Sequence, residues 1–199
     1  MFLSVFDMFK IGMGSSSSKT TGPMVAAARF LELMRAPRFN FGGVKARLHG
    51  SLAFTGVGHG TDRATILGLA GFDPQTYVHD RADAILAEIR DIHRITVSGL
   101  PVLKFDSKND IQFDFGANLP RHAHGMVLMA RDNQGDVILQ ETYYSAGGGF
   151  VLSEAEMDVP RPETSLRGVP YPFNTAREML RMAETSGKSI SQMKRNEFS

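Results

Sequence analysis

The segment 126–145 reads MVLMARDNQGDVILQETYYS and predicts a β-hairpin. Two stretches suited to strands, 126–131 and 137–145, flank the polar sequence DNQGD, in which Gly135 is placed to take a positive φ. Shorter strands separated by turn-forming residues are expected before it, at 93–98, 102–106 and 111–115. The second half of the chain therefore predicts an antiparallel sheet.

The first half of the chain predicts mostly helices. Four elements are expected there, a strand over 44–49 and helices over 24–35, 61–71 and 80–90. Pro23 suits the first turn of the first helix, because the N–H that proline lacks would have no partner at that position. Gly60 or Thr61 would cap the second helix. The predicted architecture is α+β, with helices packed on one side of a mostly antiparallel sheet.

A connector and a last helix are expected after this domain. Four prolines within thirteen residues, Pro160, Pro162, Pro170 and Pro172, predict an extended connector over 158–173. A helix over 174–186 would begin at the cap residue Asn174 and end at Gly187. The chain is therefore divided into a domain over 1–157, the connector, and a helix with the start of a linker over 174–199.

Composition excludes several classes of protein. With 22 basic and 21 acidic side chains the net charge is +1, so no overall field attracts nucleic acid or an anionic membrane. No apolar run approaches a membrane span, and Asp7 and Lys10 interrupt the opening segment where a signal peptide would be apolar. We therefore expect a cytoplasmic protein. The absence of cysteine excludes disulfides, a cysteine nucleophile and a cysteine-held iron–sulfur cluster within this chain.

Residues 14–20 read GSSSSKT and lie ahead of the first predicted helix. The pattern overlaps with a phosphate-binding loop, but Ser18 stands where that loop needs glycine, and its Cβ obstructs the wrapping of N–H groups around phosphates. Composition alone leaves a flexible loop open. Hydroxyl groups ahead of a helix N-terminus also suit an anion, so the other interpretation is a site for a carboxylate.

His59 lies in the glycine-rich segment 55–63, TGVGHGTDR, which we expect to be a loop. Gly58 and Gly60 remove side-chain bulk on both sides of it, so a ligand can approach the imidazole closely. A neutral imidazole accepts a proton, as a general base must. An exposed loop histidine without a role is the alternative. Asp62 would either orient the ring or cap the following helix.

Two further segments carry candidate site residues. His122 and His124 are two apart and lie on one side of an extended chain, but no third ligand motif accompanies them, so a polar gate beside a pocket is favoured over a metal site. Residues 143–150, YYSAGGGF, form either a close wall around a ligand or a simple turn. His49, His79 and His93 receive no role.

Five motifs in one order resemble the N-terminal (β) domain of the bacterial iron–sulfur L-serine dehydratases. They are FDMFKIG at 6–12, SSSKTTGPM at 16–24, GSLAFTGVGHGTD at 50–62, LPRHAHGM at 119–126 and YYSAGGGF at 143–150. The resemblance continues through the connector and the final helix, and so covers nearly the whole chain. Single-chain members of that family carry a larger catalytic domain on the C-terminal side, whose cysteines hold a [4Fe–4S] cluster.

The resemblance implies a lyase that converts L-serine to pyruvate and ammonia. An iron with an open coordination site would bind the substrate as a Lewis acid, and a base would remove the Cα proton. The family base corresponds to His59. The substrate-facing residues correspond to Ser16, Ser17, Ser18, Lys19, Thr20, His122 and His124. No cofactor or metal is expected to be ligated by this chain itself.

Three positions depart from the family pattern. Lys19 stands where the family has histidine, which exchanges a titratable ring for a flexible amine that can still pair with a substrate carboxylate. Ser15 replaces a proline and loosens the loop, and His124 replaces an asparagine. Because these changes fall at the site, they predict altered substrate preference, a shifted pH profile or a weaker enzyme.

The resemblance also implies partners. We expect this chain to be inactive alone, to assemble with a C-terminal serine dehydratase catalytic domain, to act on L-serine and to form a homodimer. Neither nucleic acid nor membrane is expected as a partner. A fold-level analogy with a regulatory domain of phosphoglycerate dehydrogenase supplies the alternative, a non-catalytic module that binds a small carboxylate or mediates dimer contacts.

Overall fold

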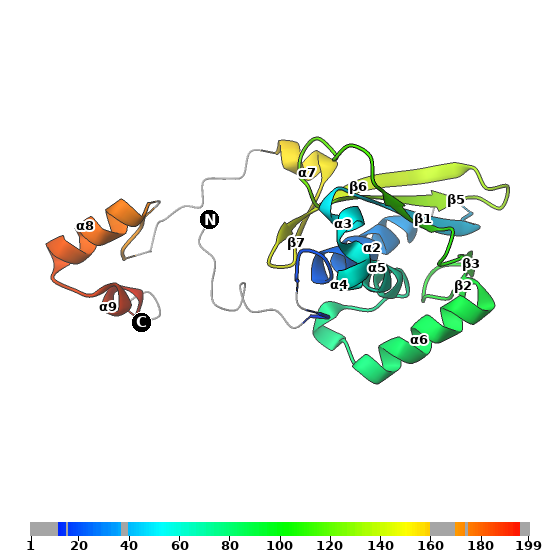
Figure 1. Cartoon of the computed structure of the whole chain (residues 1–199), viewed down its shortest axis with the longest axis horizontal. Coiled ribbons are helices and arrows are strands. Elements are labelled where there is room, and N and C mark those ends of the chain that lie inside the picture. Colours follow the sequence, from blue (N-terminus) through cyan, green and yellow to red (C-terminus); the bar gives the residue numbers. More distant parts are fainter. Residues whose placement is uncertain (1–11, 15, 37–39, 160–169, 174, 196–199) are drawn as a thin grey trace. The chain divides into compact units, whose positions relative to one another are not determined.

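The computed structural model describes residues 12–159, except 15 and 37–39, and residues 170–195, except 174. Residues 12–159 lie in one compact unit and residues 170–195 in a second (Figure 1). Within these described ranges, no helix is both long and apolar enough to cross a membrane.

The described part of the larger unit contains a seven-stranded mixed sheet. Its order is β2-β3-β1-β5-β6-β7, and β4 also pairs with β1. The strands are β1 (Gly43–His49), β2 (Arg94–Ile95), β3 (Leu103–Lys104), β4 (Ile111–Asp114), β5 (Gly125–Arg131), β6 (Val137–Gly147) and β7 (Phe150–Ser153). Only β3 and β4 run parallel to their neighbour β1, so these described strands are mostly antiparallel, as predicted.

The predicted hairpin is confirmed as β5 and β6. Its register pairs Gly125 with Tyr144, and Gly135 in the connecting turn has a φ of 100°. The side chain of Asp132 accepts three backbone N–H groups of that turn, from Gln134, Gly135 and Asp136. Local turn chemistry therefore fixes this part of the sheet.

The two strands expected at 93–98 and 102–106 are much shorter than predicted. β2 ends at Ile95, because the following backbone closes a turn in which the Leu100 N–H donates to the carbonyl of Val97 at 3.3 Å. The carbonyl of Ser98 accepts from Nε of Arg35 at 3.1 Å. These carbonyls are thus bonded outside the sheet, and the strand stops before them.

Helices α2, α5 and α6 lie on one side of the sheet, as predicted (Figure 1). The helical elements of this unit are α2 (Thr21–Met34), α3 (Ser51–Phe54), α4 (Gly56–His59), α5 (Thr61–Leu69), η1 (Pro74–Thr76), α6 (His79–Ile92) and α7 (Glu154–Asp158). α2 and α5 cross closely at Gly68, where a Cβ would lie only 2.3 Å from the carbonyl oxygen of Met24. Phe30, Leu31 and Leu67 belong to the buried cluster that these helices form with the sheet.

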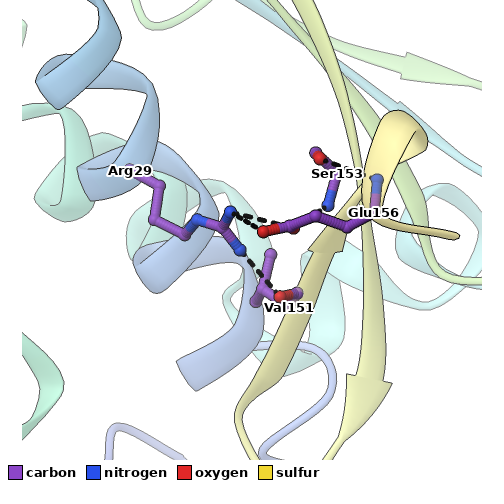
Figure 2. Close-up of polar contacts among 4 residues, drawn as sticks. All are labelled: Arg29, Val151, Ser153 and Glu156. Carbon is purple, nitrogen blue, oxygen red and sulfur yellow. Dashed lines mark hydrogen bonds and ion pairs between the residues drawn. The ribbon is translucent and has the colours of Figure 1, made fainter. Parts of the chain in front are cut away.

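An ion pair ties α2 to the end of the sheet (Figure 2). Nη2 of Arg29 donates to both carboxylate oxygens of Glu156, at 2.8 and 2.9 Å, and Nη1 donates to the carbonyl of Val151 at 2.8 Å. The Ser153 N–H also donates to Glu156, at 2.7 Å, in the capping box of α7. The Arg29 guanidinium, followed by the Ser153 N–H, holds the pKa of the Glu156 carboxyl below its ordinary 4.5.

Replacing Glu156 with glutamine is expected to lower the free energy of unfolding at neutral pH by about 1 kcal/mol or less, because both partners are well exposed. A carboxyl whose folded-state pKa is lowered stabilises the fold above the unfolded pKa, and this contribution is lost as the pH falls through the folded pKa. The difference between E156Q and the wild-type chain should therefore shrink below pH 4.5. Urea unfolding across this range measures it. E88Q, at an exposed position of α6, is the control, and an equally large effect there would contradict the assignment.

The smaller unit contains α8 (Ala176–Ser186) and α9 (Ile190–Arg195). The predicted C-terminal helix is therefore present, and it ends at Gly187, which has a φ of 64°. Its N-cap is Thr175, whose hydroxyl accepts the Glu178 N–H in a capping box, whereas the expected cap Asn174 lies outside the described residues. α9 was not predicted. Residues 160–169 of the expected connector lie outside the described part, and the division at 157/158 stays a prediction.

Candidate functional site

Gly14 and residues 16–20, which we call the serine turn, lead into α2. The carbonyl of Ser16 accepts the backbone N–H groups of Lys19 and Thr20, both at 3.0 Å, and the hydroxyl of Thr20 at 2.8 Å. The Gly22 N–H donates to the carbonyl of Ser17 at 2.8 Å. The described residues of the segment are therefore held in a turn by their own backbone.

The predicted substrate-facing residues of this turn differ in exposure. Ser17 is exposed, and Ser16, Ser18 and Lys19 are half-buried, with the hydroxyls of Ser16 and Ser18 3.4 Å apart. Thr20 is fully buried and its hydroxyl is bonded to the turn itself. Thr20 thus stabilises the turn. The residues of the turn that a ligand can contact are Ser16, Ser17, Ser18 and Lys19.

The glycine-rich segment around His59 is helical and not a loop, contrary to expectation. Gly50 adopts a φ of 54° and a ψ of −129°, which lets the chain leave β1 and enter α3 at once. A Cβ on Gly50 would lie 2.5 Å from the carbonyl oxygen of Ala123, to which the Ser51 N–H donates. Gly60, with a φ of 72°, ends α4 and begins α5. Glycines therefore permit the two sharp changes of direction that set α4 in place.

The ring of His59 is held by the backbone of its own turn. Its Nδ1 lies 2.8 Å from the carbonyl oxygen of Thr55. Because a carbonyl only accepts, Nδ1 carries a proton, and in the neutral ring Nε2 is then the nitrogen with a free lone pair. Asp62 lies one residue into α5 and lines a different cavity, with Arg90 and His93, so Thr55 is the residue that orients His59.

His59 opens into a cavity of about 450 Å³. A Cβ on Gly14 would lie 3.3 Å from Cγ2 of Thr20 and 3.7 Å from the carbonyl oxygen of His59, so the start of the serine turn and the His59 turn are neighbours. The cavity is lined by residues 12–14 and 57–60, Arg63, Tyr77 and His79. Gly14 thus lines the same cavity as His59, whereas the predicted substrate-facing residues 16–20, His122 and His124 are not among the residues that line it.

Arg63, Tyr77 and His79, which also line this cavity, belong to a group of polar side chains completed by Asp83. The hydroxyl of Tyr77 lies 3.0 Å from Nδ1 of His79, whose Nε2 lies 3.4 Å from Oδ2 of Asp83. Asp83 also pairs with Arg63. The sequence assigned no role to His79. Its local pattern does not distinguish it, because the group combines Arg63 of α5, Tyr77 directly after η1, and His79 and Asp83 of α6.

His122 and His124 form a pair just before the first residue of β5, with ring centroids 5.0 Å apart. The His124 N–H donates to Nδ1 of His122 at 3.0 Å, and Nδ1 of His124 lies 3.3 Å from the carbonyl oxygen of Ser145. Burial, the neighbouring His122 and, to a smaller extent, the Lys19 ammonium lower the pKa of His124. The Lys19 charge thus acts on the ring of His124.

Replacing Lys19 with glutamine is expected to raise the pKa of His124, because a positive charge that opposes protonation of the ring is removed. An NMR titration of the imidazole resonances of residues 1–199 measures it. K104Q removes an exposed lysine on β3 and serves as the control. A His124 pKa that is the same in K19Q and in the wild-type chain would show that the two side chains do not interact.

Residues 4–156 match the family model described as the serine dehydratase beta chain. The chain belongs to the serine dehydratase beta chain family. It is 41% identical over 195 residues to the L-serine dehydratase of Streptomyces coelicolor, covering 97% of this chain and 43% of that protein. It is 40% identical over 193 residues to L-serine dehydratase TdcG of Escherichia coli, covering 95% of this chain and 41% of that protein.

A third relative has a similar identity and coverage. The chain is 37% identical over 192 residues to the L-serine dehydratase of Helicobacter pylori, covering 96% of this chain and 42% of that protein. This member of the serine dehydratase beta chain family thus spans about two fifths of the length of the curated relatives it matches. The family resemblance inferred from the five motifs is confirmed.

The sequence identified Ser145 only as part of a motif, and the structure shows what surrounds its side chain. Its side-chain oxygen is buried and, in the described part of the chain, has no hydrogen-bond partner. A Cβ on Gly22 would lie 2.0 Å from this oxygen and 3.6 Å from the carbonyl oxygen of Ser17. The Ser145 N–H donates to the carbonyl of His124 at 3.0 Å, and the carbonyl of Ser145 lies 3.3 Å from Nδ1 of the His124 ring. It therefore joins the serine turn to the histidine pair, and the glycines after it turn the chain into β7.

Proposed function

We propose that this chain is the part of an L-serine dehydratase that supplies a proton acceptor and substrate-binding turns, in an enzyme that converts L-serine to pyruvate and ammonia. The observation that carries the proposal is the His59 ring, whose Nδ1–H is bonded to Thr55 while the ring opens into a cavity beside the serine turn. The names of the relatives support the substrate and the reaction.

In this proposal Nε2 of His59 takes the proton from Cα of L-serine. The electron pair of that C–H bond forms the Cα–Cβ double bond as the hydroxyl leaves Cβ with its bonding pair, and this hydroxide together with the proton taken up by His59 makes the one water released. The resulting aminoacrylate tautomerises to an imine, and water hydrolyses the imine to pyruvate and ammonia. The bond from Nδ1 to Thr55 stays favourable in the protonated ring, because Nδ1 carries a proton in both states.

The substrate carboxylate is proposed to lie against the serine turn. Ser16, Ser17 and Ser18 carry hydroxyl donors, and Lys19 adds a positive charge beside the start of the fourteen-residue helix α2. His124 contacts Ser145, which lies against Gly22 at the start of α2, and with His122 it would line the entrance. A neutral His124, favoured by its lowered pKa, leaves Lys19 as the cation for the carboxylate.

The chain does not itself fit an iron–sulfur cluster. It has no cysteine, and its described residues gather no group of three histidine, aspartate or glutamate side chains that could hold a metal ion. We therefore place the [4Fe–4S] cluster of the complete enzyme in the catalytic domain that the family resemblance implies as the partner. In the same proposal the complete enzyme is a cytoplasmic homodimer, and residues 1–199 alone are inactive.

The experiment joins residues 1–199 to the part of the Streptomyces coelicolor L-serine dehydratase that the match leaves uncovered. We expect the anaerobically prepared fusion to release pyruvate and ammonia in equal amounts from L-serine, and the chain alone to release neither. A fusion that contains iron and sulfide but forms no pyruvate would contradict the proposal. L-Serine binding by the chain alone, measured by calorimetry together with an inactive fusion, would favour the regulatory module.

A further inference from the structure

Three large apolar side chains are exposed next to the candidate site. Phe54 is 63% exposed, Val57 70% and Phe115 60%. The rings of Phe54 and Phe115 meet edge to face with their centroids 5.4 Å apart, so they form a fixed aromatic pair. We refer to Phe54, Val57 and Phe115 as the aromatic patch.

The local fold explains why these side chains point outward. In α3 the buried positions belong to Leu52 and Ala53, and a helix of a single turn leaves Phe54 on the opposite side. Phe115 follows the last residue of β4, past the end of the strand's pairing with β1. Large apolar side chains gathered at the surface in this way point to another surface that covers them.

The aromatic patch is continuous with the His59 cavity. Val57 lies two residues before His59 on the single turn α4, and both line that cavity. Between them, Gly58 has open space where a Cβ would stand, with no atom of the described residues within 4 Å. On its other side, Phe115 lines a hollow of about 810 Å³ with Arg47 and Asp114. A partner that covers Val57 therefore lies at the edge of the His59 cavity.

We propose that the aromatic patch docks the polypeptide that corresponds to the remaining length of the relatives, and that this contact closes the His59 cavity. The proposal rests on the proposed function, which requires a second polypeptide to complete the site. The relatives supply the candidate, because the chain covers only 41–43% of their length. Aromatic side chains are enriched at the desolvated centres of such interfaces.

A binding experiment tests the docking directly. The probe is the uncovered part of the Streptomyces coelicolor protein, produced separately under anaerobic conditions, and its affinity for residues 1–199 is measured by biolayer interferometry. The double variant F54S/F115S is expected to bind about tenfold more weakly or worse. The control is V102S/V137S, which makes the same kind of change at residues that are 52% and 51% exposed elsewhere. Equal affinities for the two variants would overturn the proposal.

A second measurement keeps the proposal testable where the separate fragment does not fold. In the fusion of residues 1–199 with that fragment, amide hydrogens of residues 51–59 and 112–116 should exchange more slowly than in the chain alone. Unchanged exchange there would overturn the docking. Sedimentation of the chain alone gives the remaining outcome, since a dimer that F54S/F115S converts to monomer would assign the patch to a second copy and overturn the proposal.

The outcomes separate this inference from the proposed function. Binding and hydrogen exchange are read without turnover, so they report docking even if His59 has no catalytic role. A fusion that deaminates L-serine normally with His59 replaced would contradict the proposed function and leave the docking intact. Full activity and tight binding with F54S/F115S would contradict the docking and leave the role of His59 intact.

Discussion

Replacing His59 with asparagine is expected to lower kcat for L-serine deamination by about 10²–10⁴-fold in the assembled enzyme, the contribution typical of a positioned general base. Asparagine remains polar but has no nitrogen that accepts a proton from carbon. The loss should fall mainly on kcat, because the residues proposed to hold the carboxylate lie in the serine turn, which the substitution leaves unchanged. Steady-state kinetics of the fusion enzyme measure both parameters.

The matched control is H93N. His93 is an exposed histidine that adopts a φ of 53° at the end of α6, and asparagine tolerates that conformation well. We expect its kcat to match that of the unmodified fusion. If H59N also kept wild-type kcat, another group would have to take the proton, and the assignment of His59 would be wrong.

Replacing Gly50 with alanine is expected to destabilise the larger unit by about 3 kcal/mol or more. Two costs combine: a positive φ that L side chains rarely adopt, and a Cβ placed 2.5 Å from the carbonyl oxygen of Ala123 and from Oδ1 of Asn118. Relief would require the His122 segment to move away from the start of α3. Chemical unfolding of residues 1–199 at neutral pH measures the loss.

Gly58 provides the control for this experiment. It lies in the adjacent turn α4, and a Cβ there would meet no described atom within 4 Å. G58A is therefore expected to change the free energy of unfolding by less than about 1 kcal/mol, as an exposed glycine substitution without strain does. Equal stability of G50A and G58A would show that the close approach at Gly50 does not hold in solution.

The elements that could be predicted from the sequence are those fixed by neighbouring residues. The β5–β6 hairpin follows from the turn chemistry around Asp132 and Gly135, and α2 and α6 follow from apolar periodicity. The parallel pairing of β4 with β1, which sets Ala46 opposite Ile111, joins segments about 65 residues apart in the chain. No local pattern predicts such a pairing, so no parallel pair of strands was predicted within the mostly antiparallel sheet.

The candidate site divides in the same way. His59 could be singled out because two adjacent glycines leave it bare, and the serine turn because its hydroxyl groups are consecutive. The hydrogen bond that His59 Nδ1 donates to the Thr55 carbonyl could not be foreseen. The high glycine content argued against the one-turn helix that creates it. Tyr77, His79 and Ser145 gain their places only when η1, α6 and β6 fold against the two turns.

The bonds accepted by the Ser16 carbonyl have a consequence for how a small substrate is received. Because the N–H groups of Lys19 and Thr20 and the Thr20 hydroxyl are already bonded to that oxygen, the backbone of the turn is set before any ligand arrives. The entropy of ordering these residues is lost once, during folding, and is not charged against each encounter. In the proposed enzyme a three-carbon amino acid, which offers few atoms for binding, would thus meet a turn whose backbone is already in place.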